Sequence, residues 1–428
     1  MNTLGPFSSL YIEGHACGAP FCAAFLSWLG KSFGFEVSGN LKDIDPNKKP
    51  APVILGPQCL KLIRKIGLDE RDLIKACAGT FAVGTEINHP NLKGPSFYPY
   101  LTEVKGLDGV AFHQIHSLQN LRSTQQTYAE LFAPFYLAKE SRFVHPSGEG
   151  NYRYSLICDS ILFDDYMRRA AVHYGFQDKG QRNADLIIKA CMDDFTASEQ
   201  STAQLDATMP TQMLYQFKGK ILKQVAHTQT QRIETKFNPH EPSLIAMRGH
   251  EAVWHDNIID LEKLLSNLRP FDHSYMDVIA QMLLTLFDIW PANSELTANR
   301  QEFNRHTLNI ANRARDYQTA PFLAAGAIES NKVSPELQTK WEQFLSRGRL
   351  VSYDDEPVSD SEWIAYMLAL GITPRRIDPL AYKVSEPQSL EALKKQQRSA
   401  ELWAADMAFQ SDYLRKAQAL YVNRKSPS

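Results

Sequence analysis

The N-terminal part of the chain alternates short apolar runs with amphipathic stretches. The run Leu10-Tyr11-Ile12 is followed by two glycines and then by an apolar stretch at 21–29, which predicts a strand, a tight turn and a helix. The segment Phe35-Glu36-Val37 predicts a second, weaker strand. Apolar residues at helical spacing within 59–66 and 73–77 predict two further helices. Strands and helices that alternate in this way are typical of an α/β unit.

The middle of the chain mixes several kinds of segment. Residues 88–109 are rich in proline, glycine and aromatic side chains, which predicts a loop with short strands. The pattern predicts an amphipathic helix for 160–174 and a buried strand for 184–188. Residues 193–210 are polar and predict no element, whereas the alternation within 211–237 predicts a hairpin.

The C-terminal part of the chain has helical patterns only. Residues 276–290 form an apolar run at helical spacing that ends before Pro291. Four more helices are predicted, at 302–317, 335–347, 360–369 and 390–421. The sequence therefore predicts an α/β (α+β) fold, with a mixed core over 1–275 and a mainly helical C-terminal region over 276–428 packed on it.

The net charge and the lengths of the apolar runs argue against nucleic acid and a membrane as partners. The chain has 428 residues and a net charge of -2, which gives no overall field for binding nucleic acid. No apolar run reaches the roughly 18 residues of a membrane span, and the apolar stretch after Glu13 lacks the basic lead of a signal peptide. The six cysteines are scattered and mostly in apolar company, as expected for reduced thiols. We therefore expect a cytoplasmic protein with neither nucleic acid nor a membrane as partner.

Six segments, taken in order along the chain, resemble one enzyme family. They are 66–81, which ends in Gly79-Thr80-Phe81, then Phe97-Tyr98-Pro99-Tyr100, 109–114, 162–169, 254–275 and 371–380. In this order they are similar to the tryptophan halogenases, flavoproteins that receive reduced FAD from a separate reductase. The resemblance implies a three-layer core like that of the flavin-dependent monooxygenases, with FAD as cofactor and a substrate-side segment interleaved at about 80–150.

The dinucleotide-binding turn of that family has lost glycines in this chain. Such a turn needs one glycine for the tight bend and another where the backbone meets the pyrophosphate. With Gly18 aligned to the last glycine, Glu13 stands at the first position and His15 at the second, which leaves Gly14 and Gly18 as a degenerate cofactor site. A carboxylate about 5 Å from a phosphate oxygen costs on the order of 3 kcal/mol at an effective dielectric near 20. An ordinary strand–helix turn is the alternative interpretation.

Two further segments that approach the flavin in the family have changed. Glu262 stands where the family has glycine, in a segment that is polar for a buried strand. Residues 188–192 replace a strand that ends in a turn similar to Cys-Ser-Gly. Together with the altered turn, these replacements predict that FAD binding in the family manner is weak or absent.

The residues that the resemblance assigns to halogenation are replaced as well. The family lysine that carries the halogen follows the phenylalanine of Gly79-Thr80-Phe81, and this chain has Ala82 there. Asp272 corresponds to the substrate-side glutamate, and His273-Ser274-Tyr275 replaces a Ser-Thr-Gly backbone that contacts the halide. The tunnel motif with two tryptophans is missing from 215–225. Lysines elsewhere are predicted to be solvated: Lys75, Lys93 and Lys105.

Four side chains are candidates for a substrate pocket that stacks an indole ring: Phe97, Tyr98, Phe112 and His113. Packing in an ordinary core is the alternative. His113 and His116 have the spacing of metal ligands on a helix, but the resemblance places them in a strand–loop segment and no third ligand follows. We therefore predict no metal site. Asp272 and its neighbour His273 are candidates for an acid–base pair, without an identifiable nucleophile.

Three hypotheses for the function follow from these residues. In the first, a non-catalytic halogenase-like protein binds a small indole-like aromatic molecule or serves as a partner subunit, in a homo-oligomer or beside a related halogenase. In the second, the protein is an FAD-dependent oxidoreductase or monooxygenase with altered cofactor binding. In the third, a different enzyme uses the retained substrate-side pocket around His113 and Asp272. Flavin retention after desalting distinguishes the first hypothesis from the second.

Overall fold

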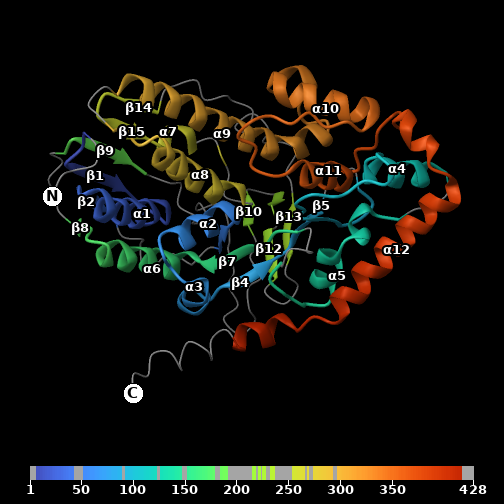
Figure 1. Cartoon of the computed structure of the whole chain (residues 1–428), viewed down its shortest axis with the longest axis horizontal. Helices are drawn as coiled ribbons and strands as arrows, with labels where there is room; N and C mark the ends of the chain where they lie inside the picture. Colours follow the sequence, from blue (N-terminus) through green and yellow to red (C-terminus); the bar gives the residue numbers. More distant parts are fainter. Residues whose placement is uncertain are drawn as a thin grey trace.

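The computed structural model describes most of the chain. The described residues are 6–42, 52–88, 92–122, 126–146, 152–178, 184–190, 215–217, 220–222, 224–227, 232–236, 253–265, 268, 273–292 and 296–416. The polar stretch at 193–210 lies outside the described residues, and so does Asp272. Sheets and helices mix in the first part of the described chain, and helices alone follow α7 (Glu262–Leu265), which confirms the predicted fold class (Figure 1).

The largest sheet has six strands in the order β14-β15-β9-β1-β2-β8. The members of this sheet are β14 (Trp254–His255), β15 (Ile258–Asp260), β9 (Leu186–Lys189), β1 (Ser9–Gly14), β2 (Glu36–Leu41) and β8 (Gln177–Asp178). Neighbouring strands run parallel, except that β14 and β15 are antiparallel. Because β2 lies on one side of β1 and β9 on the other, the carboxyl ends of β1 and β9 meet at a topological switch point, where α/β sheets bind ligands.

Two helices pack beside this sheet. Helix α1 (Gly18–Phe33) packs on β1 and β2, and α6 (Ser160–His173) packs along α1 (Figure 1). Apolar side chains lie on most sides of α1, as in a helix that other elements enclose. Gly34, with a φ of 84°, ends α1 by donating its N–H to a carbonyl of the last turn. Asp159 begins α6 by accepting two backbone N–H groups of the first turn. The strand, turn and helix predicted at the N-terminus are confirmed.

A three-stranded antiparallel sheet separates the two hydrophobic cores of the molecule. Its order is β3-β7-β4, with β3 (Pro52–Leu55), β7 (Ser155–Asp159) and β4 (Thr80–Ala82). Successive side chains of a strand point to opposite faces. Phe81 and Leu156 accordingly belong to the larger core, whereas Ala82 and Ile157 face the second core.

Six further strands form a four-stranded sheet and a separate hairpin. The sheet has the order β12-β13-β5-β6, with β12 (Gln224–His227), β13 (Arg232–Lys236), β5 (Gly84–Asn88) and β6 (Ser96–Pro99). The hairpin pairs β10 (Tyr215–Phe217) with β11 (Lys220–Leu222). Both β10–β11 and β12–β13 are antiparallel neighbours, so the hairpin character predicted for 211–237 is confirmed.

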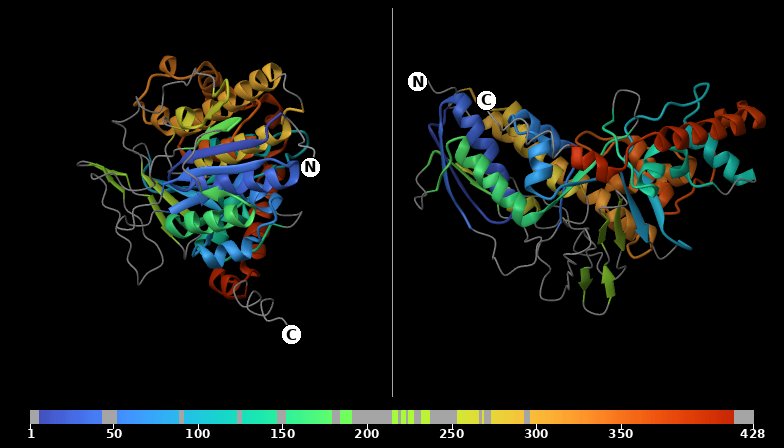
Figure 2. Two further views of the ribbon diagram at one scale, coloured as in Figure 1. Left: turned by 90° about the vertical axis from the view of Figure 1, so that its left-hand side faces the viewer. Right: turned by 90° about the horizontal axis from the view of Figure 1, so that it is seen from below.

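The remaining helices cover the sheets and make up the C-terminal region. The helices are α2 (Pro57–Lys65), α3 (Glu70–Ala76), α4 (Phe112–Arg122), α5 (Ala133–Lys139), α8 (Ser274–Asp288), α9 (Thr297–Ala324), α10 (Pro335–Arg347), α11 (Asp360–Ala369) and α12 (Glu386–Ala405). Figure 2 shows an elongated molecule, with the six-stranded sheet at one end and α4 and α12 at the other. Within the described chain, no helix combines the length and the apolar character that crossing a bilayer requires.

Two local predictions are wrong. The segment around 109–114 was expected to be strand and loop, but it leads into α4, because one face of a helix there buries Ile115 and Leu118 in the second core. The last helix was expected to run to residue 421, yet α12 ends at Ala405. The chain leaves the helix to pair with an earlier segment, where Phe143 donates its N–H to the carbonyl of Ala408. The predicted division of the chain at 275 stays a prediction; it lies one residue after α8 begins at Ser274.

Candidate functional site

Gly14 and Gly18, which the sequence predicts as a degenerate cofactor site, lie at the turn between β1 and α1. Gly14 ends β1, and a Cβ placed there would lie 2.6 Å from the carbonyl oxygen of Ala190 and 2.8 Å from the Cβ of Ala19. The close packing of β1 against α1 and the end of β9 is therefore enough to require a glycine here, whether or not a cofactor binds. Ala16 adopts a φ of 57° in the turn, and Gly18 is the buried first residue of α1. The turn thus has the expected place in the fold without the glycines of the family.

Charged side chains gather at the carboxyl edge of the six-stranded sheet. The Nζ of Lys189 on β9 lies 4.0 Å from a carboxylate oxygen of Glu13 on β1 and 3.9 Å from one of Asp260 on β15. We call these three residues the edge triad. The Glu13 and Lys189 side chains are about 30% exposed, so water reaches these ion pairs. Glu262, the anion singled out in the sequence, is the exposed first residue of α7.

A basic side chain binds the end of β2. A dinucleotide site commonly places an acid near this point, where it accepts hydrogen bonds from ribose hydroxyls. In this chain the guanidinium of Arg168, from α6, donates to the carbonyl of Leu41 at 3.0 Å and to that of Lys42 at 2.6 Å. Asp164, one turn earlier on α6, pairs with the same guanidinium. The carbonyls at this strand end are therefore engaged by the protein itself.

A buried carboxylate binds the N-terminus of α2. Asp277 on α8 accepts the backbone N–H of Cys59 at 2.9 Å and that of Gln58 at 3.1 Å. Burial raises the pKa of Asp277, and the positive charges of His273 and Arg153 oppose that shift only in part. The Asp277 carboxyl group therefore satisfies two of the N–H groups at this helix end.

Ala82, which the resemblance aligns with the family lysine, lies on the three-stranded sheet. Ala82 of β4 is fully buried and pairs with Ser155 of β7. Residues directly opposite in an antiparallel pair share one face, so the Ser155 hydroxyl lies beside the Ala82 methyl group. The Ser155 Oγ is buried and has no hydrogen-bond partner among the described residues. The three lysines predicted to be solvated are indeed exposed: Lys75, Lys93 and Lys105.

Three residues from distant parts of the sequence form a polar cluster around a fully buried carboxylate near this position. An Nη of Arg153 lies 2.8 Å from Oε2 of Glu362, and the Nε2 of His273 lies 3.3 Å from Oε1. We call Arg153, His273 and Glu362 the central polar cluster. Burial alone would raise the pKa of Glu362, but the charges of Arg153 and His273 hold it below its usual value. Glu362 is therefore an anion in the interior of the protein.

Local structure fixes each member of the central polar cluster. Arg153 closely precedes β7, and its N–H donates to the carbonyl of Tyr100 at 2.7 Å. His273 stands at the start of α8. Glu362 lies in the first turn of α11, where Ser359 accepts its backbone N–H. Three separate element ends thus converge on one carboxylate.

Aromatic rings pack against the central polar cluster. The centroid of Tyr317 lies 4.5 Å from that of Tyr366 and 5.0 Å from that of Trp363, and Tyr98 lies 4.8 Å from Tyr366. Tyr100 packs on His273 with ring centroids 4.7 Å apart. The hydroxyl of Tyr317 donates to that of Tyr98 at 3.0 Å. We call Tyr98, Tyr100, Tyr317, Trp363 and Tyr366 the aromatic cluster.

The predicted pocket residues lie in different places. Tyr98 belongs to the aromatic cluster, whereas Phe97, its neighbour on β6, packs against Phe135. Phe112 packs against Phe132 with ring centroids 6.5 Å apart. The fourth candidate, His113, hydrogen-bonds the carbonyl of Gly348 at 2.7 Å. The structure therefore brings one of the four candidates to the site.

The histidines of α4 are fastened to backbone carbonyls. The Nε2 of His116 lies 2.9 Å from the carbonyl of Gln126, and His113 binds a different segment. Burial lowers the pKa of His116 to about 4, although the Gln126 carbonyl opposes that shift and His113 adds to it. No group of three or more histidine, cysteine or carboxylate side chains among the described residues is arranged to hold a metal ion.

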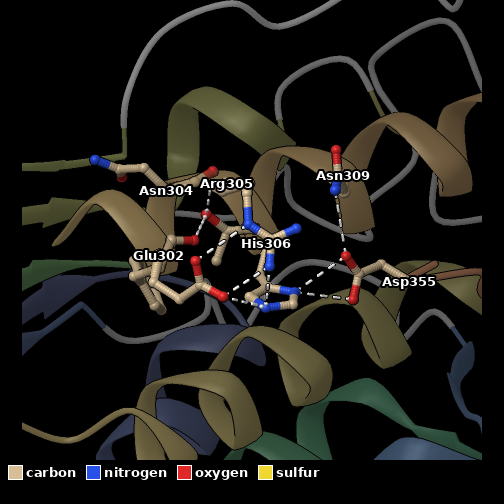
Figure 3. Close-up of polar contacts among 8 residues, drawn as sticks. Glu302, Asn304, Arg305, His306, Asn309 and Asp355 are labelled. Atoms are coloured by element: carbon tan, nitrogen blue, oxygen red, sulfur yellow. Dashed lines mark hydrogen bonds and ion pairs between the residues drawn. The ribbon is translucent and has the colours of Figure 1, made fainter. Parts of the chain in front are cut away.

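A second polar network lies on the surface of α9. Figure 3 shows His306 between Glu302 and Asp355. The Nε2 of His306 lies 3.0 Å from Glu302, and its Nδ1 lies 3.1 Å from Asp355. The guanidinium of Arg305, 2.7 Å from the same glutamate, holds the pKa of Glu302 below its usual value. This network fastens α9 to the segment that precedes α11.

Arg153, Ser155 and Glu362 were not predicted from the sequence as site residues. Glu362 is an acid among the apolar residues of α11, which is a signal for a functional or paired carboxylate. Arg153 and Ser155 precede and begin an apolar strand and carry no such signal. Asp272 adjoins His273 of the central polar cluster but lies outside the described residues.

Comparison with known proteins agrees with the resemblance. The family model "Tryptophan halogenase" matches residues 55–200 and 189–386. No curated protein sequence matches the chain significantly.

Several solved structures with the same fold are flavin-dependent halogenases. BrvH, a flavin-dependent halogenase from Brevundimonas sp. BAL3, has a TM-score of 0.74 and 14% identity over 96% of this chain and 99% of its own. A flavin-dependent halogenase from Xanthomonas campestris has a TM-score of 0.74 and 16% identity, over 96% and 98%. For a tryptophan 6-halogenase from Streptomyces toxytricini the TM-score is 0.69 and the identity 13%, over 95% and 99%. The chain belongs to the tryptophan halogenase family.

Proposed function

We propose that this member of the tryptophan halogenase family does not halogenate and instead binds a small aromatic molecule in its substrate-side interior. The observation that carries the proposal is Ala82. The resemblance assigns the halogen-carrying amine to this position, and a methyl group has no nitrogen that can capture hypohalous acid.

The buried amine of Lys340 does not compensate for Ala82. Its Nζ lies 4.6 Å from the ring centroid of Trp363 in the aromatic cluster. The same Nζ is 2.5 Å from a carboxylate oxygen of Glu356, which engages it in an ion pair. A lysine in such a pair does not present a free amine to a halogen donor.

The residues at the sheet edge do not fit FAD bound in the family manner. Glu13 and Asp260 place two carboxylates, offset by one Lys189, at the switch point where a pyrophosphate would approach. A carboxylate about 5 Å from a phosphate oxygen opposes binding by on the order of 3 kcal/mol at an effective dielectric near 20. Arg168 binds the carbonyls at the end of β2, where a ribose would need an acceptor. We therefore propose that flavin binding is weak or absent.

The aromatic cluster supports a flat, aromatic ligand. Tyrosine and tryptophan rings suit the recognition of an aromatic molecule, because they offer flat apolar faces for stacking. Tyr98 and Tyr317 each have their ring centroid within 5 Å of that of Tyr366. An indole-like molecule is the ligand class that the proposal names.

The test has two parts. Purified protein is mixed with excess FAD, desalted and examined by visible absorbance, with a flavin-dependent halogenase treated in parallel as the positive control. We expect the control to retain a flavin band and this protein to lose it, and a stoichiometric band here would overturn the cofactor part. Calorimetric titration with 3-ethylindole tests the binding part. We expect heat of binding at a single site, and its complete absence would remove the ligand proposal.

Association with a related halogenase stays a prediction of the partner-subunit hypothesis. Co-expression with such an enzyme, followed by size-exclusion chromatography, would show a shared peak if the two chains form a stable complex.

A further inference from the structure

We infer that Arg153 and Ser155 form the polar end of the ligand site and select an aromatic ligand that carries an uncharged oxygen acceptor, such as an aryl ketone or amide. This inference rests on the proposed function, because it specifies the ligand of the same substrate-side interior. It starts from two buried hydrogen-bond donors that the described protein leaves unused.

The two unused donors are the Ser155 hydroxyl and the Nε of Arg153. Both atoms are buried, and neither has a hydrogen-bond partner among the described residues. Buried polar atoms in proteins are nearly always hydrogen-bonded, because an unpaired one has lost its water without replacement. An acceptor atom of a ligand can replace the hydrogen bond to water that each donor has lost.

The two donors lie on the substrate side of the three-stranded sheet. Ser155 is opposite Ala82 on the face that belongs to the second core, at the place of the missing lysine. The Arg153 backbone binds the carbonyl of Tyr100, a member of the aromatic cluster. A ring packed against that cluster can therefore direct a substituent toward both donors.

The charge of Glu362 decides which acceptor fits. One end of the Arg153 guanidinium is already paired with Glu362 at 2.8 Å, and that carboxylate is completely buried. A ligand carboxylate would bring a second buried anion to a single guanidinium, and a buried charge without its own partner is unfavourable. A ketone or amide oxygen accepts from both donors and adds no charge.

Three probes of similar shape test this selectivity: 3-acetylindole, 3-ethylindole and indole-3-carboxylate. Calorimetric dissociation constants are measured for the wild type, for Ser155→Ala, and for Ser27→Ala. Ser27 on α1 is a matched control, because its buried hydroxyl also has no partner among the described residues but lies in the other core. The thermal midpoint of each variant checks that it folds.

We expect the wild type to bind 3-acetylindole about tenfold more tightly than 3-ethylindole, as for one good buried hydrogen bond, and more tightly than indole-3-carboxylate. Ser155→Ala should abolish most of the advantage of 3-acetylindole, leave 3-ethylindole unchanged, and keep or raise the thermal midpoint. Ser27→Ala should change neither probe.

Equal affinity of the wild type for 3-acetylindole and 3-ethylindole would overturn the inference and leave the proposed function intact. Equal effects of the two serine variants would overturn it as well. Tightest binding of indole-3-carboxylate would replace the uncharged acceptor with an anion and so reject the inferred ligand class. If no probe binds, the proposed function fails and this inference fails with it.

Discussion

The edge triad and the central polar cluster are two arrangements of the same kinds of residue in opposite surroundings. In the edge triad, Lys189 stands about 4 Å from Glu13 and from Asp260, and water reaches the pairs. In the central polar cluster, Arg153 and His273 approach Glu362 to 2.8 and 3.3 Å in the interior. Interactions of the first kind contribute little to stability, whereas breaking the second kind leaves an uncompensated buried charge.

The different burial of the edge triad and the central polar cluster means that substitutions in the two regions should have different consequences. At the sheet edge, the charges are partly exposed and weakly coupled to the rest of the fold, and we propose that they oppose a polyanionic cofactor. In the interior, the charged side chains of the central polar cluster connect the start of β7 with α8 and α11. Replacing one of them should therefore lower the stability of the fold. The following predictions test this contrast, from the largest expected effect to the smallest.

Glu362→Ala should lower the free energy of unfolding by about 3–5 kcal/mol, because it leaves Arg153 without its buried partner. Urea denaturation of the wild type and the variant at pH 7 measures the difference. A loss below about 1 kcal/mol, the typical upper value for exposed pairs, would show that the central polar cluster is as solvated as the edge triad.

The buried side chain of His116 should make the stability of the protein depend on pH. His116 has a pKa of about 4 against an ordinary value of 6.5, chiefly because it is buried. Between these two values the unfolded chain binds more protons than the folded protein, so the free energy of unfolding should fall as the pH drops from 6.5 toward 4. The difference corresponds to roughly 3 kcal/mol.

His116→Gln provides the control for this pH dependence. Glutamine can still donate a hydrogen bond to the Gln126 carbonyl but does not titrate in this range. Denaturation curves at several pH values should therefore show a shallower acid loss in the variant. An unchanged slope would assign the acid sensitivity to other groups.

At the sheet edge, the double variant Glu13→Gln with Asp260→Asn should raise the affinity for FAD by about tenfold. It removes two carboxylates from the switch point that the phosphates would approach, although solvent and salt reduce each repulsion. Quenching of flavin fluorescence at fixed ionic strength measures the affinity. Glu262→Gln serves as the control, because Glu262 is exposed and should have no effect.

If the double variant binds FAD no better than the wild type, charge is not what excludes the cofactor. The missing glycines at positions 13 and 15, with Ala16 at a φ of 57°, would then carry the exclusion.

Glu13→Gln by itself should change the free energy of unfolding by less than about 1 kcal/mol, the smallest effect in this series. The Glu13 carboxylate is 4.0 Å from the Lys189 Nζ and partly exposed, so water replaces the interaction. Thermal denaturation of the variant beside the wild type measures it. A loss comparable to that of Glu362→Ala would erase the contrast between the two regions.

Local pattern was sufficient for much of the fold. The order of strands and helices, the turn after β1 and the helical C-terminal region follow from periodicities that a few neighbouring residues define. The alignment of Ala82 with the family lysine, and of Glu13 and His15 with two family glycines, is also read from the sequence alone and stays a prediction. These features need no knowledge of distant contacts.

Tertiary structure alone decided which of these residues act together. Arg153, His273 and Glu362 are more than eighty positions apart in sequence, and no periodicity relates them. The sequence predicted that the Glu262 carboxylate lies where the family approaches the flavin, but Glu262 is exposed. Asp260, two residues earlier, is the carboxylate that pairs with Lys189. The alternation of a strand restricts where each side chain points, but only the packing of strands and helices from distant segments determines what it meets there.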